Sequence, residues 1–112
     1  MLRLVTSMTR SVVCFGAYTL DPLTRELLLA DRPVRLTRLE FELLQLFADH
    51  PGRLYTPRQL LELIWKSGER TSEHTVKAHI SRLRAKLDRG DPRSYIETVW
   101  GVGYRFNGHC LK

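Results

Sequence analysis

The residues best suited to a chemical role lie in one cation-rich segment, HTVKAHISRLRAKLDR, at positions 74–89. In a helix, successive residues of this segment are about 100° apart around the axis. Ala78 and Ala85 then occupy the centre of one face. Their small side chains would let the helix axis approach another surface closely, and the surrounding cations favour an anionic surface. That face is completed by His74, Ser81, Arg82 and Arg89.

The DNA major groove fits such a face, because it is about 12 Å wide and admits an α-helix. An arginine beside the centre of the face can donate two hydrogen bonds to a guanine, and an alanine can contact a thymine methyl group. Lys77 and Arg84 lie toward one edge of the face, and Thr75 and His79 lie toward the other. Cations at the edges suit the phosphates on the groove walls.

Two other interpretations of the segment remain open at this point. A run of cations is commonly only a solvated face of a helix. A basic helix can also lie on a membrane surface, but that requires a free apolar face. Here the apolar stripe is needed for the core of the protein, so the membrane interpretation is disfavoured. The stripe consists of Val76, Ile80, Leu83 and Leu87.

A predicted hairpin follows the helix, in the sequence YIETVWGVGYRF at 95–106. Polar and apolar residues alternate on both sides of WGVG, and we expect Gly101 and Gly103 to supply the positive φ angles of a tight turn. A basic helix followed by such a hairpin suits a major-groove reader with an adjacent minor-groove probe. The hairpin side chains that can donate hydrogen bonds to phosphate or sugar oxygens are Thr98, Trp100, Tyr104 and Arg105.

Two further helices must position the basic helix, and both begin with a capping box. Thr37 and Glu40 mark the start of the first, which should end at 50–52. Thr56, Pro57 and Gln59 mark the start of the second. A polar loop at 66–71 then precedes the third helix, expected from about residue 72 to 89, where Gly90 and Pro92 end it.

The region before the first helix is predicted to be a small antiparallel sheet. Apolar runs at 12–15, 17–21, 26–30 and 33–36 are separated by the turn-like sequences DPLT and ADRP. The run ELLLA could also be helical, but five residues between turn signals favour a strand. The expected fold class is therefore α+β, with an N-terminal four-stranded antiparallel sheet, three helices and a C-terminal hairpin.

The length and composition of the chain fit one domain, and they argue against secretion and membrane insertion. The chain has 112 residues and a net charge of +6, of which residues 70–112 carry +5. We expect a domain at 12–107, a flexible leader at 1–11 and a tail at 108–112. The leader lacks the apolar region of a secretory signal, and no apolar run is long enough to span a membrane. Cys14 and Cys110 are expected to be free thiols in a reducing cytoplasm.

Catalytic and cofactor sites are not expected. GVG at 101–103 lacks the third glycine and the following helix of a phosphate-binding loop. His74 and His79 are five residues apart and hence on different helix faces, and no HExxH motif is present. No nucleophile elbow surrounds a serine. The sequence therefore predicts no enzyme activity, no metal site and no cofactor.

Three ordered motifs resemble the winged-helix effector domain of OmpR/PhoB-type response regulators. They are LTRLEFELLQLFADHPGRLYTPRQLLELIW, HTVKAHISRLRAKL and IETVWGVGYRF, and the resemblance covers roughly residues 12–107. It implies a winged helix-turn-helix fold and sequence-specific binding of double-stranded DNA for transcription regulation. The recognition helix at 72–89 would enter the major groove, and the wing at 95–106 would lie at the adjacent minor groove.

The resemblance also implies roles for individual positions. Those matching DNA-base contacts are Thr75, Lys77, Ala78 and Arg82. Those matching DNA-backbone contacts are Trp65, Arg70, His74, His79, Ser81, Arg84, Thr98 and Tyr104. The wing positions at the minor groove are Trp100 and Arg105. The loop that often contacts RNA polymerase in activators holds Lys66, Ser67, Gly68, Glu69 and Arg70.

Three departures from the family pattern stand out. The family often has arginine where this chain has Ser81 and Trp100. A receiver domain, which needs on the order of a hundred further residues, is absent from the sequence. The chain is thus either an effector domain taken from a response regulator or a stand-alone relative. Family members commonly bind direct repeats head to tail, so we expect a monomer or weak dimer that pairs on DNA. The alternative function is a winged-helix protein-interaction module without specific DNA readout.

Overall fold

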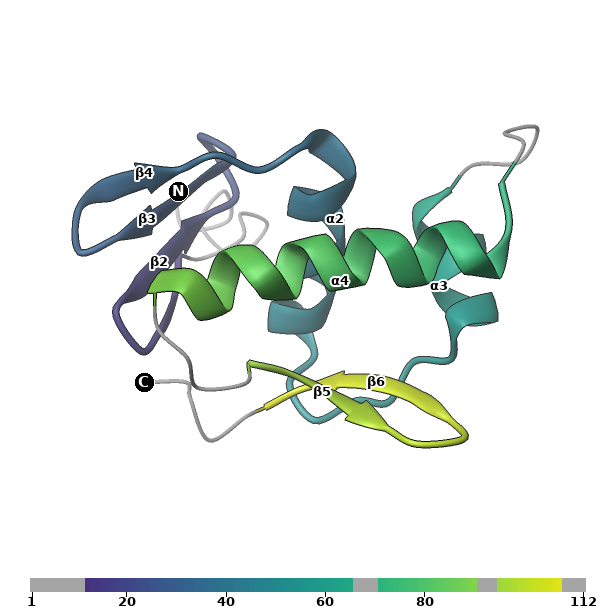
Figure 1. Ribbon diagram of the computed structural model, residues 1–112. Helices are drawn as coiled ribbons and strands as arrows, with labels where there is room; N and C mark the ends of the chain where they lie inside the picture. Colours follow the sequence, from purple (N-terminus) through teal and green to yellow (C-terminus); the bar gives the residue numbers. More distant parts are fainter. Residues whose placement is uncertain (1–11, 66–70, 91–94, 108–112) are drawn as a thin grey trace, which may run out of the picture.

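The structure, a computed structural model, describes residues 12–65, 71–90 and 95–107 (Figure 1). The first four strands form an antiparallel sheet in the order β1-β2-β3-β4. The Asp21 side chain supports the first predicted turn by accepting a 2.9 Å hydrogen bond from the Leu23 N–H. The run ELLLA is a strand, as expected. The strands are β1 (Val13–Phe15), β2 (Tyr18–Asp21), β3 (Glu26–Leu29) and β4 (Arg32–Val34).

Both predicted capping boxes are confirmed. Helix α2 (Arg38–Asp49) follows Thr37, whose hydroxyl accepts the Glu40 N–H at 3.2 Å while the Glu40 carboxylate accepts the Thr37 N–H at 2.9 Å. Helix α3 (Pro57–Ile64) follows the same arrangement between Thr56 and Gln59. These bonds satisfy backbone donors that a helix start otherwise leaves unpaired, so both boundaries follow from local sequence.

Helix α4 (Glu73–Gly90) is the long basic helix, and it packs across both other helices (Figure 1). Its predicted apolar stripe is confirmed, because every side chain of the stripe is at most 1% exposed. Burial of this face fixes the rotation of the helix about its own axis, so the opposite face must point away from the core. The stripe consists of Val76, Ile80, Leu83 and Leu87.

An aromatic cluster joins the N-terminal sheet to the C-terminal hairpin. The rings of Phe15, Tyr18, Tyr95 and Phe106 lie 5.1–6.4 Å apart between centroids. The Tyr18 hydroxyl donates a 2.6 Å hydrogen bond to the Leu87 carbonyl near the end of α4. The sheet, α4 and the hairpin therefore share one core.

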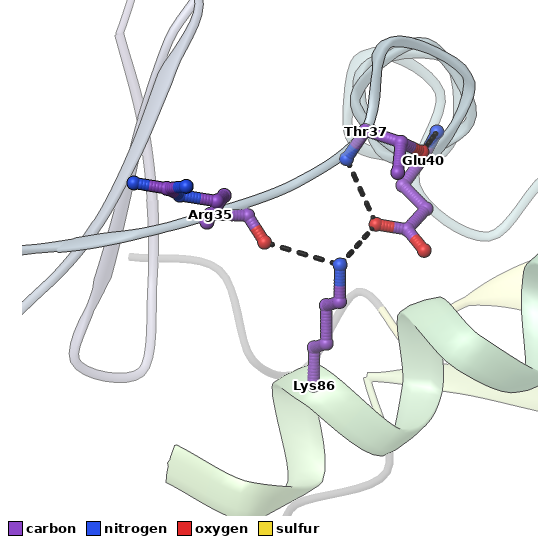
Figure 2. A network of polar contacts seen from close by, with 4 residues as sticks. All are labelled: Arg35, Thr37, Glu40 and Lys86. Carbon is purple, nitrogen blue, oxygen red and sulfur yellow. Dashed lines mark hydrogen bonds and ion pairs between the residues drawn. The ribbon is translucent and has the colours of Figure 1, made fainter.

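A second link between α2 and α4 is polar. Lys86 donates to the Glu40 carboxylate at 2.6 Å and to the Arg35 carbonyl at 3.1 Å, and Glu40 also holds the Thr37 cap (Figure 2). Glu40 is 1% exposed. Burial alone would raise its pKa, but the hydrogen bonds from Lys86 and Thr37 together with the charge of Lys86 outweigh it and hold the pKa below its ordinary value. The buried carboxylate is therefore ionised at neutral pH.

The C-terminal hairpin pairs β5 (Ile96–Val99) with β6 (Gly103–Phe106), and we call it, with its turn at 100–102, the wing. A backbone bridge joins it to the segment before α3: Tyr55 and Tyr104 exchange N–H···O bonds of 2.8 Å in both directions. Burial raises the pKa of the Tyr55 phenol at this junction. The wing is thus held along the outer edge of β6, close to its turn, as well as along one face.

The expected role of the two wing glycines is half wrong. Gly101 does adopt a positive φ of 81° in the turn, but Gly103 is not among the residues with positive φ. A Cβ on Gly103 would lie 2.0 Å from the Tyr55 carbonyl oxygen. Glycine is needed there because the backbone of Tyr55 approaches closely. The sequence of the hairpin alone does not predict this contact.

Several sequence-based expectations fall outside the described residues. They concern the leader at 1–11, the loop at 66–70, Pro92, Cys110 and the tail at 108–112. Cys14 is an exposed free thiol. In the part of the chain that the structure describes, no helix combines the length and apolar character needed to cross a bilayer.

Candidate nucleic-acid interface

The outward face of α4 is open along its length. Because the apolar stripe is buried, the side chains on the opposite face of α4 are exposed, except that of Ala78, which is half-buried. Within the described residues, Arg82 and Lys77 are exposed and form no hydrogen bond or ion pair through their side chains, so their charges are available to a ligand. The exposed side chains of this face are His74, Lys77, Ser81, Arg82, Ala85 and Arg89.

The edge of α4 nearest α3 is less open. His79 is half-buried, and its Nδ1–H donates to the Thr75 carbonyl at 2.9 Å, which requires the proton to be on Nδ1 because a carbonyl only accepts. The His79 ring contacts Trp65 edge to face at 5.3 Å. Trp65 caps the end of α3 and is only 7% exposed. The Trp65 and His79 side chains, together with the Thr75 carbonyl, form one packed group at the edge of the exposed face.

The opposite edge of α4 is tied to the wing by Arg84. Its Nη1 donates to the Thr98 hydroxyl at 2.6 Å and to the Ile96 carbonyl at 3.3 Å. Its guanidinium carbon lies 5.6 Å from the centre of the Tyr104 ring. Three of the residues predicted for the DNA backbone, Arg84, Thr98 and Tyr104, therefore meet at one point between helix and wing.

A cleft of about 430 Å³ separates α4 from the wing. Lys77 and Arg84 line its helix side, and Thr98 and Tyr104 line its wing side. Pro57, at the first position of α3, also lines it, although the sequence suggested for Pro57 only a role in starting the helix. Its place in the cleft follows from the Tyr55–Tyr104 bridge, which brings the start of α3 to the wing.

The two wing residues predicted for the minor groove lie in different surroundings. Trp100 is at the tip and 88% exposed. Arg105 pairs across the strands with Glu97 at 3.0 Å. Strand alternation places this ion pair on the face of the hairpin opposite Thr98 and Tyr104, which face α4. Arg105 therefore points away from the cleft.

Comparison with known protein families gives a match over residues 31–106 to the family described as "Transcriptional regulatory protein, C terminal". The chain belongs to this family. Its members are DNA-binding domains of OmpR/PhoB type, and the resemblance seen in the three sequence motifs is confirmed. The winged-helix fold predicted from the sequence is confirmed as well.

Individual relatives agree with this assignment. The chain is 34% identical over 107 residues to the phosphate regulon transcriptional regulatory protein PhoB of Escherichia coli, covering 96% of this chain and 47% of PhoB. It superposes on the response regulator DrrB of Thermotoga maritima with a TM-score of 0.77 at 32% identity, over 95% of this chain and 48% of DrrB. The chain thus spans about half the length of these two relatives.

Some of the similar structures are DNA complexes. The DNA-binding domain of RstA from Klebsiella pneumoniae, solved in complex with the RstA box, matches with a TM-score of 0.72 at 32% identity. The match covers 88% of this chain and 98% of that domain. The chain therefore matches nearly the whole of a DNA-binding domain that was solved in complex with the RstA box.

Proposed function

We propose that this domain binds double-stranded DNA sequence-specifically and thereby regulates transcription, with α4 in the major groove and the wing at the adjacent minor groove. The proposal includes no catalytic step and no cofactor, and it places the protein in the cytoplasm. The family and the relatives support it, since they are transcription regulators and one is solved on its DNA box.

The cleft between α4 and the wing is the single observation that carries the proposal. A helix in the major groove and a hairpin in the neighbouring minor groove must straddle the sugar–phosphate strand between the two grooves. The cleft lies where that strand would pass, and its lining supplies two cations and two hydroxyls, the groups that bind phosphate oxygens. These groups belong to Lys77, Arg84, Thr98 and Tyr104.

Within this proposal, the exposed face of α4 reads bases. Arg82 is the principal reader, because it is exposed and can donate two hydrogen bonds to a guanine. Thr75 and Ala78 lie at or beside the groove floor, and Lys77, which also lines the cleft, lies between the bases and the nearby phosphates. Contacts to the DNA backbone come from His74, Ser81 and Arg84, the last together with Thr98 and Tyr104. The packed Trp65–His79 pair faces the backbone of the other DNA strand. Arg105 contacts sugar or phosphate from the outer face of the wing.

Assembly and partners are also part of the proposal. The domain binds direct repeats head to tail and is a monomer or weak dimer without DNA. The loop at 66–70 is the proposed surface for RNA polymerase. Its Arg70 is also a proposed contact to the DNA backbone. The full-length protein is either a response regulator with a receiver domain or a stand-alone relative.

Selection of bound sites from a random duplex library tests the function. We expect one enriched half-site, repeated in direct orientation about one helical turn apart. Binding to the selected duplex should weaken steeply with salt, because Lys and Arg release counterions from phosphates. A library that yields no enriched sequence, with no salt-sensitive binding to any duplex at low salt, would favour the protein-interaction module instead.

A further inference from the structure

The wing tip has an unusual composition for a surface that faces a polyanion. Trp100 is 88% exposed, and Val102, on the other side of Gly101, is 45% exposed. The other tryptophan of the chain, Trp65, is 7% exposed and packs on His79. Neither apolar tip residue contributes to the core, so their exposure needs another explanation.

The tip is held in a fixed position relative to α4. The turn is closed by a 3.0 Å hydrogen bond from the Val102 N–H to the Val99 carbonyl. Arg84 anchors β5 to α4, and the Tyr55–Tyr104 bridge anchors β6 to the segment before α3. An exposed aromatic side chain on a firmly held hairpin loses little conformational entropy on binding, which favours its use as a contact.

Among the described residues, the cations closest to the tip that have no acidic partner lie in the cleft. Lys77 and Arg84 lie in the cleft lining with Trp100 and Val102, whereas the charge of Arg105 is paired with Glu97 on the opposite face. The tip itself carries no charge, so it gains nothing from the strong negative potential of a narrow A-tract minor groove. Apolar side chains instead gain energy by packing against sugars and by partial insertion between unstacked bases.

We propose that Trp100, supported by Val102, is an apolar wedge that enters the minor groove and selects for DNA that unstacks easily there. This inference rests on the proposed function. The preferred ligand is a duplex with a pyrimidine–purine step, such as TA or CA, under the wing, because these steps kink at low cost. Specificity at this position then comes from deformability, while Arg82 reads bases in the major groove.

Fluorescence tests the contact directly on the whole chain. Acrylamide in the free protein should quench mainly the exposed Trp100, since Trp65 is buried. Adding the duplex selected by the parent protein should protect Trp100, and the Trp100→Phe variant identifies which tryptophan is protected. Unchanged quenching on a duplex that is bound with salt-sensitive affinity would overturn the wedge and leave the proposed function intact.

Affinity tests the selectivity. Replacing the TA or CA step with an A-tract should lower the affinity of the parent protein at least about fivefold. Trp100→Ala should lower the affinity by a similar factor, but only for the original duplex. Trp100→Arg should instead prefer the A-tract, and its slope of log affinity against log salt should be steeper by the share of about one phosphate contact. Leu23→Ala, which removes another exposed apolar side chain from the β2–β3 turn, is the matched control and should bind as the parent does.

Three results would contradict the wedge. One is that Trp100→Ala binds both duplexes as the parent does. Another is that Trp100→Arg enriches the same sequence beneath the wing. The third is protection of Trp100 without DNA that increases with protein concentration, which would identify the tip as a protein contact. Absence of any DNA binding would instead refute the proposed function itself.

Discussion

The Arg84 guanidinium donates a 2.6 Å hydrogen bond to the Thr98 hydroxyl, and this bond joins α4 to the wing across the cleft. The two residues are 14 positions apart and were each predicted to contact DNA phosphate. Because one guanidinium nitrogen is already engaged, Arg84 has two roles in the proposed complex. It supplies charge to the cleft and it sets the distance between the two DNA-reading elements.

Mutation of each partner separates these two roles. Arg84→Ala should weaken all duplex sequences similarly and reduce the slope of log affinity against log salt by about 0.9, one phosphate's share. Thr98→Val removes the acceptor and leaves the charge, so it should weaken binding without changing that slope. Titrations at several salt concentrations measure both quantities. Equal salt slopes for Arg84→Ala and the parent protein would show that Arg84 does not meet a phosphate.

Arg82 is expected to determine sequence preference. Arg82→Ala should reduce the ratio of affinities for selected and scrambled duplexes by an amount worth about 1–3 kcal/mol, the value of one bidentate arginine–guanine pair. Binding to scrambled DNA should largely persist, because other cations hold the phosphates. Arg38→Ala on α2, an exposed arginine paired with Glu42, is the control. If the affinity ratio of Arg82→Ala matches that of the control, the base-reading role is wrong.

The sequence predicted those parts of the fold that depend on local patterns. The capping boxes at Thr37 and Thr56 involve residues three positions apart, and the apolar stripe of α4 follows from helical periodicity. The recognition face was predicted for the same reason, as the side opposite that stripe. Its DNA contacts remain predictions.

What the sequence did not reveal depends on segments far apart in the chain. The Lys86–Glu40 bond joins residues separated by 46 positions, and the close approach of Gly103 to Tyr55 arises only when two segments pack together. Similarly, nothing in the sequence around Arg84 indicates that it donates to Thr98. Pairings of this kind require the register of one element against another, which a residue pattern within either element does not specify.

The two wing glycines should respond differently to alanine. In Gly103→Ala the new Cβ would lie 2.0 Å from the Tyr55 carbonyl oxygen, so the backbone bridge must open, and we expect a loss of at least about 2 kcal/mol in the free energy of unfolding. In Gly101→Ala the new Cβ would have no neighbouring atom within 4 Å, so we expect only the strain of the positive φ, about 1 kcal/mol. Urea denaturation compares the two. A larger loss for Gly101→Ala would contradict the close-approach explanation.

The Lys86–Glu40 pair should make stability depend on pH in the acid range. The folded state lowers the Glu40 pKa from its ordinary value of 4.5, so the stabilisation is fully present above that value and is lost as the pH falls through the lower folded pKa. Lys86→Met leaves a carboxylate that is 1% exposed with Thr37 as its remaining partner. Because the Lys86 side chain is 30% exposed, we expect a loss of about 2 kcal/mol at pH 7, below that of a fully buried pair.

Lys86→Met should also change the contribution of Glu40 to the pH profile. Without Lys86, burial, which raises the Glu40 pKa, is opposed by the Thr37 hydrogen bonds alone, so we expect that pKa to rise and the stabilisation by ionised Glu40 to be lost. The difference in unfolding free energy between parent and variant should therefore shrink below about pH 4.5. Arg58→Met, which breaks the exposed pair with Glu62, should cost under about 1 kcal/mol. Urea denaturation from pH 3 to 7 measures this, and a difference for Lys86→Met that stays constant over that range would show that the pair does not control the ionisation of Glu40.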